Sequence, residues 1–103
     1  MKLAGEMIDE GGHAFKFRTP GCMAKYLAEH PGEHYKGLFV TDHNTGKFIE
    51  AADATFARVP LSRISVEKDY VAFTDATDAE AHAKLEGGTT MKWDAVLASA
   101  NTP

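Results

Sequence analysis

The soft donor atoms of this 103-residue chain lie mostly in its first quarter. The segment GCMAKYL places the only cysteine, Cys22, directly before Met23, and Met7 and His13 precede it. Thiolate, thioether and imidazole groups together suit Cu(I) better than hard cations. These four residues are therefore a candidate soft-metal site. The competing interpretation makes both methionines core residues and Cys22 a small buried hydrophobic residue.

The position of Cys22 in the sequence favours its ionised form. Thr19 and Pro20 are typical of a helix N-cap and a first helical residue, so Cys22 is the third residue of the predicted helix. Unpaired backbone N–H groups and the positive end of the helix dipole favour an anion there. Such surroundings favour a thiolate, the form that binds metals.

A hairpin is expected to bring the other donors close to this cysteine. In HAFKFR, apolar and polar residues alternate, which predicts a half-buried strand over 13–18 that pairs with a strand over 2–8. Met7 ends one strand, His13 begins the other, and Cys22 lies beyond its end, so we expect the three to converge at one end of the sheet. The remaining histidines are expected to face solvent: His30, His34, His43 and His82.

Composition excludes several classes of function. The net charge of −4 and the lack of a basic stripe argue against nucleic-acid binding. No apolar run reaches the roughly 18 residues of a membrane span, and the chain as given shows no secretory signal. C-x-x-C, H-E-x-x-H and glycine-rich phosphate loops are absent from the sequence. We expect a single domain over residues 1–103.

A second helix and further strands follow. Strands are predicted over 37–42, 55–59, 70–74 and 89–93. Thr77 and Glu80 resemble a capping box, Ala81 and Leu85 are expected to face inward, and Gly87-Gly88 closes the helix.

The two halves of the sequence echo each other. With an offset of 58 residues, Thr19 falls on Thr77, Leu27 on Leu85, and Cys22 on Glu80. Each half reads as strand, capped helix and strand. This pattern predicts an α+β domain built from two similar units.

Three segments resemble the family of the nitrous-oxide reductase accessory protein NosL. They are GCMAKYL, GLFVTDHNTGKFIEAADATFARV and YVAFTDATDAEAHAKLEGGTTMKWDAVL, and the resemblance covers about residues 20–97. It implies a fold of two similar β-β-α-β units, related to organomercurial lyase. It also implies an envelope protein, often a lipoprotein, that binds Cu(I) and helps supply the reductase with copper.

Two motifs of the family are altered here. Where the family has C-G-M, this chain reads GEM, which keeps Met7 but has Gly5 in place of the cysteine. Where the family has P-M-G before the VAF strand, the chain reads SVEKD, residues 65–69.

The resemblance and the donor set together predict a non-catalytic protein that binds and delivers Cu(I). Cys22 is the expected thiolate anchor, Met7 and Met23 are weak ligands that permit release, and His13 is a fourth donor. The expected partner is a copper-receiving enzyme, and copper could also bridge two copies of the chain. The expected location is the periplasm or cell envelope, with the cytoplasm left open.

Two other functions stay open at this point. The first is a metal-free interaction module that kept the scaffold and lost the site, which the altered motifs favour. The second is a thiol enzyme related to organomercurial lyase, although that chemistry needs paired thiols and the chain has one cysteine.

Overall fold

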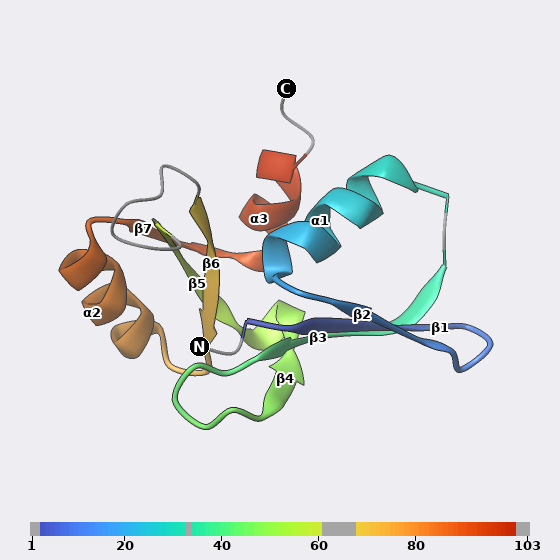
Figure 1. Cartoon of the computed structure of the whole chain (residues 1–103), viewed down its shortest axis with the longest axis horizontal. Coiled ribbons are helices and arrows are strands. Elements are labelled where there is room, and N and C mark those ends of the chain that lie inside the picture. Colours follow the sequence, from blue (N-terminus) through green and yellow to red (C-terminus); the bar gives the residue numbers. More distant parts are fainter. Residues whose placement is uncertain (1–2, 33, 61–67, 101–103) are drawn as a thin grey trace.

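Two antiparallel sheets with the same connectivity make up the protein (Figure 1). The computed structural model describes residues 3–32, 34–60 and 68–100. The elements along the chain are β1 (Gly5–Asp9), β2 (Ala14–Phe17), α1 (Pro20–Glu29), β3 (Tyr35–Thr41), β4 (Phe48–Glu50), the short 3-10 helix η1 (Ala51–Asp53), β5 (Thr55–Pro60), β6 (Lys68–Phe73), α2 (Ala76–Glu86), β7 (Thr89–Lys92) and α3 (Trp93–Ala100).

The strand order confirms a duplicated α+β fold. One sheet has the order β2-β1-β3-β4 and the other β6-β5-β7. In each unit the first strand is central, the second strand pairs beside it, and the strand after the helix returns to its other side. The segments β1-β2-α1-β3 and β5-β6-α2-β7 are therefore two β-β-α-β units, and β4 extends the first sheet.

The sheet of β5, β6 and β7 is buried on both faces. Helix α2 lies on one face, where Ala79 and Ala83 contact the sheet, and α1 and α3 cover the other face. Figure 1 shows this arrangement of the three helices. Four consecutive residues of β6, Tyr70 to Phe73, are accordingly all buried. Alternate residues of such a strand serve two different cores. A continuous apolar run such as YVAF is the sequence consequence.

The two sheets meet at the end of β3. Asp42 forms a parallel bridge with Ala72 of β6, and the backbone N–H of His43 donates to the carbonyl oxygen of Ala72 at 2.8 Å. The two units are thus joined through backbone hydrogen bonds as well as through side-chain packing.

The start of α2 differs from the prediction. The N-cap is Asp75, whose Oδ1 accepts the backbone N–H of Thr77 at 2.8 Å, so Thr77 lies inside the helix. An aspartate is as good a cap as threonine, and this one precedes the predicted capping box. Aligning the two helices by their caps pairs Cys22 with Asp78, and not with Glu80.

The buried face of α2 differs as well. Ala79 and Ala83 face the core, whereas Ala81 is exposed and Leu85 is 81% exposed. Side chains four residues apart share one face of a helix. The predicted helix is therefore confirmed, but the prediction of its buried face is wrong. Small side chains on the true face let α2 lie close to β5 and β6.

Strand β2 is more exposed than its alternating pattern suggests. Phe15 is 38% exposed and only Phe17 of this strand is partly buried. An edge strand has a neighbour on one side only, and here α1 reaches the Phe17 end, where the Tyr26 ring packs on Phe17 at 5.4 Å. The hairpin itself is as predicted.

Neither α1, α2 nor α3, the α-helices of the described segments, is long and apolar enough to cross a bilayer.

Candidate metal centre

The N-terminal turn of α1 presents Cys22 as the sequence predicts. Oγ1 of Thr19 accepts the backbone N–H of Cys22 at 3.1 Å, which confirms Thr19 as the N-cap. Pro20 and Gly21 are the first two helical residues, so Cys22 is the third, and its side chain is exposed. The thiol therefore lies at the positive end of the helix dipole and within reach of solvent.

Two methionines lie buried on the face of the first sheet that α1 covers. Met7 and Met23 are both 0% exposed. A Cβ atom on Gly5 would lie 3.3 Å from Sδ of Met23, so the Met23 thioether sits directly over β1. Gly5 and Met7 alternate with Glu6 and therefore share this face. Met7 is therefore buried on the same face of β1 as the one over which the Met23 sulfur lies.

Gly5 is the position at which the resemblance described above implies the cysteine of a C-G-M motif. The Met23 sulfur fills the space beside it, and the residue before Met23 is Cys22. Adjacent residues of a helix do not face the same way, so the exposed thiol and the buried thioether point to different sides of the first turn of α1. The sulfur atoms are neighbours in sequence but do not form a closed cluster.

His13 lies at the opposite end of β1, and its expected convergence with Cys22 is wrong. Register pairs Phe17 with Gly5, whereas Ile8 pairs with Ala14 beside His13. The residues of β1 from end to end span roughly 13 Å at about 3.3 Å each. The alternation of HAFKFR fixes which residues share a face, but not which end of the hairpin meets α1.

The His13 side chain is 76% exposed and is bound locally. Its Nδ1 lies 3.3 Å from Oδ2 of Asp9, and its backbone N–H donates to Oδ1 of Asp9 at 2.8 Å. That backbone hydrogen bond lowers the pKa of Asp9. His13 therefore stabilises the hairpin turn.

Asp69 is a residue that sequence reasoning missed. Its Oδ1 accepts the backbone N–H of Gly21 at 3.0 Å and that of Tyr70 at 2.7 Å. A Cβ atom on Gly21 would lie 2.8 Å from Oδ2 of Asp69, so a side chain at this position would have to displace the carboxylate. A carboxylate from β6 is thus clamped onto the helix end that carries Cys22.

No local pattern could have revealed this clamp, because Gly21 and Asp69 are 48 residues apart and belong to different units. The carboxylate satisfies a backbone N–H that the helix itself leaves unpaired. Its negative charge lies at the helix turn that carries Cys22.

The donors near Cys22 do not include a carboxylate–imidazole cluster. Across residues 3–32, 34–60 and 68–100, no three His, Cys, Asp or Glu side chains gather closely enough to hold a metal ion. A soft-metal site in this region must therefore use the thioethers, or ligands from a second molecule.

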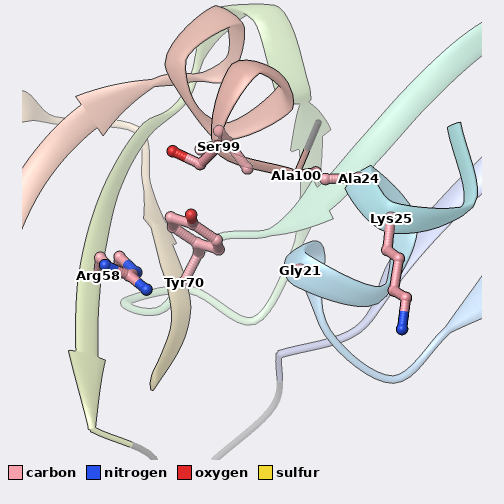
Figure 2. A pocket seen from close by; sticks show the side chains of 8 residues that line it. Gly21, Ala24, Lys25, Arg58, Tyr70, Ser99 and Ala100 are labelled. Carbon is pink, nitrogen blue, oxygen red and sulfur yellow. The ribbon is translucent and has the colours of Figure 1, made fainter. Parts of the chain in front are cut away.

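A pocket of about 250 Å³ opens beside the same helix end, between α1, α3 and the second sheet (Figure 2). Lys25, Arg58 and the hydroxyl groups of Tyr70 and Ser99 supply its polar lining, and no sulfur atom of the described residues lines it. Its full lining is Gly21, Ala24, Lys25, Arg58, Tyr70, Val96, Ser99 and Ala100. Cationic and hydroxyl donors suit an anionic group and not a soft cation.

Comparisons with known proteins agree with this fold. A sequence model of the NosL family matches residues 1–100. Among solved structures, the chain is similar to the copper chaperone NosL from Shewanella denitrificans, with a TM-score of 0.75 and 20% sequence identity. The match covers 88% of this chain and 75% of that chain. No curated protein sequence matches significantly.

Proposed function

This chain belongs to the NosL family, and we propose that it binds Cu(I) in the cell envelope and passes it to a copper enzyme. Membership confirms the resemblance seen in the sequence and makes the chain an accessory protein and not an enzyme. The structural similarity to a copper chaperone supports copper as the cargo.

The observation that carries the proposal is a pair of buried thioethers on the sheet face that α1 covers, at a helix start whose thiol is exposed. The Met23 thioether lies over Gly5 of β1, Met7 is fully buried two residues further along that strand, and Cys22 is exposed in the first turn of α1. Thiolate and thioether ligands suit soft ions such as Cu(I) better than hard cations. Asp69, hydrogen-bonded to the same helix turn, adds negative charge for the cation.

In this proposal Cys22 is the ligand that meets copper first. Its exposure allows a donor or a receiving protein to approach and exchange ligands at the metal. Met23 then joins by rotating about its flexible side-chain bonds, which few other apolar side chains could do. Weak thioether ligands keep the complex exchangeable, as delivery requires.

A dimeric version uses one thiolate from each of two copies. Each chain has one cysteine, so Cu(I) bound between two Cys22 thiolates would have two strong ligands. Size-exclusion chromatography with and without Cu(I) distinguishes this arrangement, since copper-dependent dimerisation is lost in Cys22→Ala.

The test is a competition titration of Cu(I) against a chromophoric chelator. We expect one equivalent to bind, with an affinity that falls in Cys22→Ala by more than the roughly 10–100-fold typical of losing an outer-shell partner. Met23→Leu and Met7→Leu keep the core volume, so a change in their Cu(I) affinity reports the loss of a thioether donor. Because a thioether is a weak ligand, we expect a smaller loss of affinity than in Cys22→Ala. Met91→Leu, which changes a methionine of β7, is the matched control and should leave the affinity unchanged.

His13→Ala serves as a second comparison. Because His13 lies at the far end of the hairpin, we expect its removal to leave Cu(I) affinity within about twofold of the wild type. Removal of a metal ligand would lower the affinity far more. A large loss in His13→Ala would restore His13 to the ligand set and require the hairpin to belong to a neighbouring molecule.

The full burial of Met7 and Met23 favours one alternative, a metal-free interaction module. Buried methionines are ordinary core residues, and no three-donor group of the usual metal-binding types exists in the described segments. The same titration decides between the two functions. Cu(I) affinity no tighter than that of an unstructured thiol peptide would establish the module and overturn the copper proposal.

A further inference from the structure

A pair of histidines lies where the two units meet, on the face of the second sheet that α2 covers and α1 does not. The ring centroids of His43 and His82 are 5.1 Å apart with planes inclined by 50°. His43 follows β3 and His82 belongs to α2, and both rings pack on Phe73, at 5.3 and 5.4 Å. The expectation that both face solvent is wrong, because each is partly buried.

The turn that carries His43 is held firmly to the second unit. The backbone N–H of His43 donates to the carbonyl oxygen of Ala72 at 2.8 Å. Directly before it, Oδ1 of the buried Asp42 accepts the backbone N–H of Thr74 at 3.0 Å.

A third bond ties this turn to α2 itself. Nδ2 of Asn44 donates to Oδ2 of Asp78 at 2.9 Å, and Asp78 lies one helical turn before His82. The two imidazoles are therefore positioned by hydrogen bonds of the surrounding backbone and side chains, and not by hydrogen bonds of the rings themselves. Ligands held in place by their surroundings bind metal without a large ordering cost.

The separation of the rings fits a shared metal ion. With metal–nitrogen bonds of about 2.0–2.1 Å and each nitrogen about 1 Å from its ring centre, two imidazoles on one tetrahedral ion have centres roughly 5 Å apart. We propose that His43 and His82 form a second metal site that takes a divalent transition ion, with Cu²⁺ bound most tightly.

The donor type determines that choice. Imidazole nitrogen suits Cu²⁺, Zn²⁺ and Ni²⁺, and the affinity of a given site for divalent ions peaks at Cu²⁺. The site has two protein ligands, because no third His, Cys, Asp or Glu of the described residues is close enough to join them. Water completes the coordination, and the ion stays exchangeable.

The site is independent of the proposed Cu(I) site, and the experiment keeps the two separate. Cu²⁺ alone is titrated into Cys22→Ala, which lacks the thiol that would reduce or capture the ion. We expect one equivalent to bind and its electron paramagnetic resonance spectrum to show coupling to two imidazole nitrogens. His43→Ala and His82→Ala, each in this background, should weaken binding at least tenfold.

His34→Ala in the same background is the matched control, since it removes an exposed histidine of the loop before β3. We expect its Cu²⁺ affinity to stay within twofold of the parent. Circular dichroism and thermal unfolding establish that each variant is folded, and His43→Gln and His82→Gln replace any variant that is not. Full affinity in either His43 or His82 variant, or an equal loss in His34→Ala, overturns the second site.

Discussion

The two helix starts, at α1 and α2, occupy equivalent places in the two β-β-α-β units, yet they are stabilised differently. The first turn of α1 has no acidic side chain, and a carboxylate from the other unit, Asp69, accepts its Gly21 N–H. The first turn of α2 follows its own Asp75 cap and contains Asp78. Here the other unit contributes Asn44, which donates to Asp78.

This difference shows how a duplicated fold can free one position for chemistry. A negative group near a helix start is stabilising, and α2 supplies it at its third residue, Asp78. In α1 the equivalent residue is Cys22, and Asp69 supplies the charge from a distant strand. Cys22 therefore does not have to supply the negative charge that Asp78 supplies in α2.

The helix–sheet interfaces differ in the same direction. The large, flexible Met23 thioether packs between α1 and the first sheet, whereas α2 meets the second sheet through Ala79 and Ala83. Alanine side chains are short and rigid, so the interface between α2 and the second sheet cannot rearrange. Thioether contacts can rearrange, so the first unit combines polarizable atoms with adaptable packing.

The largest expected effect comes from truncating the thioether that packs over β1. Met23→Ala should lower the free energy of unfolding by about 2–5 kcal/mol, because it leaves a cavity in a fully buried site. Leu85→Ala in α2 removes an apolar side chain that is 81% exposed, so it should change stability by less than about 0.5 kcal/mol. Urea denaturation followed by circular dichroism measures both, and equal losses would remove the contrast between the two interfaces.

A somewhat smaller effect is expected at the junction of the units. Asp42→Ala should cost about 2–3 kcal/mol, since the backbone N–H groups of Thr74 and Thr45 lose their acceptor. Asn44→Ala, which breaks only an exposed hydrogen bond, should cost less than about 1 kcal/mol. Comparable losses in the two variants would mean that the buried carboxylate does not hold the junction.

The Asp42 contribution should also depend on pH. Burial opposes ionisation, but hydrogen bonds from the Thr45 hydroxyl and from the backbone N–H groups of Thr74, Thr45 and Asn44 outweigh it and lower the pKa of Asp42 below 3.8. The contribution is therefore fully present above the unfolded pKa and is lost as pH falls through the folded pKa. Asp42→Ala should accordingly lose less stability on acidification than the wild type does, which denaturation at several pH values measures.

The smallest effect tests the clamp on α1 directly. Gly21→Ala should destabilise the protein by about 1–3 kcal/mol because its Cβ would meet Oδ2 of Asp69. Better helix propensity offsets about 1 kcal/mol of that loss. In an Asp69→Ala background the added methyl group has space, and the penalty should disappear.

A double-mutant cycle at 25 °C gives the coupling between these two positions. The same Gly→Ala change at Gly32, where a Cβ atom would meet nothing within 4 Å, is the control. Additive effects of Gly21→Ala and Asp69→Ala would exclude a specific clamp.

Local patterns in the sequence determined the elements and their repetition. Thr19 and Pro20 fix the start of α1, Gly87 closes α2 with a positive φ of 75°, and alternation or a continuous apolar run marks the strands. These signals arise from residues within one turn or one strand. Such short-range geometry does not depend on the rest of the fold.

Tertiary structure alone decided which donors meet. His13 is far from Cys22 because strand register places it at the other end of the hairpin, and Asp69 reaches Gly21 across 48 residues. His43 and His82 come together only because β3 joins β6 and α2 packs on the same sheet. The periodicity of a segment specifies which residues share a face. Which other segment covers that face, and at which end, depends on packing that no short stretch of sequence contains.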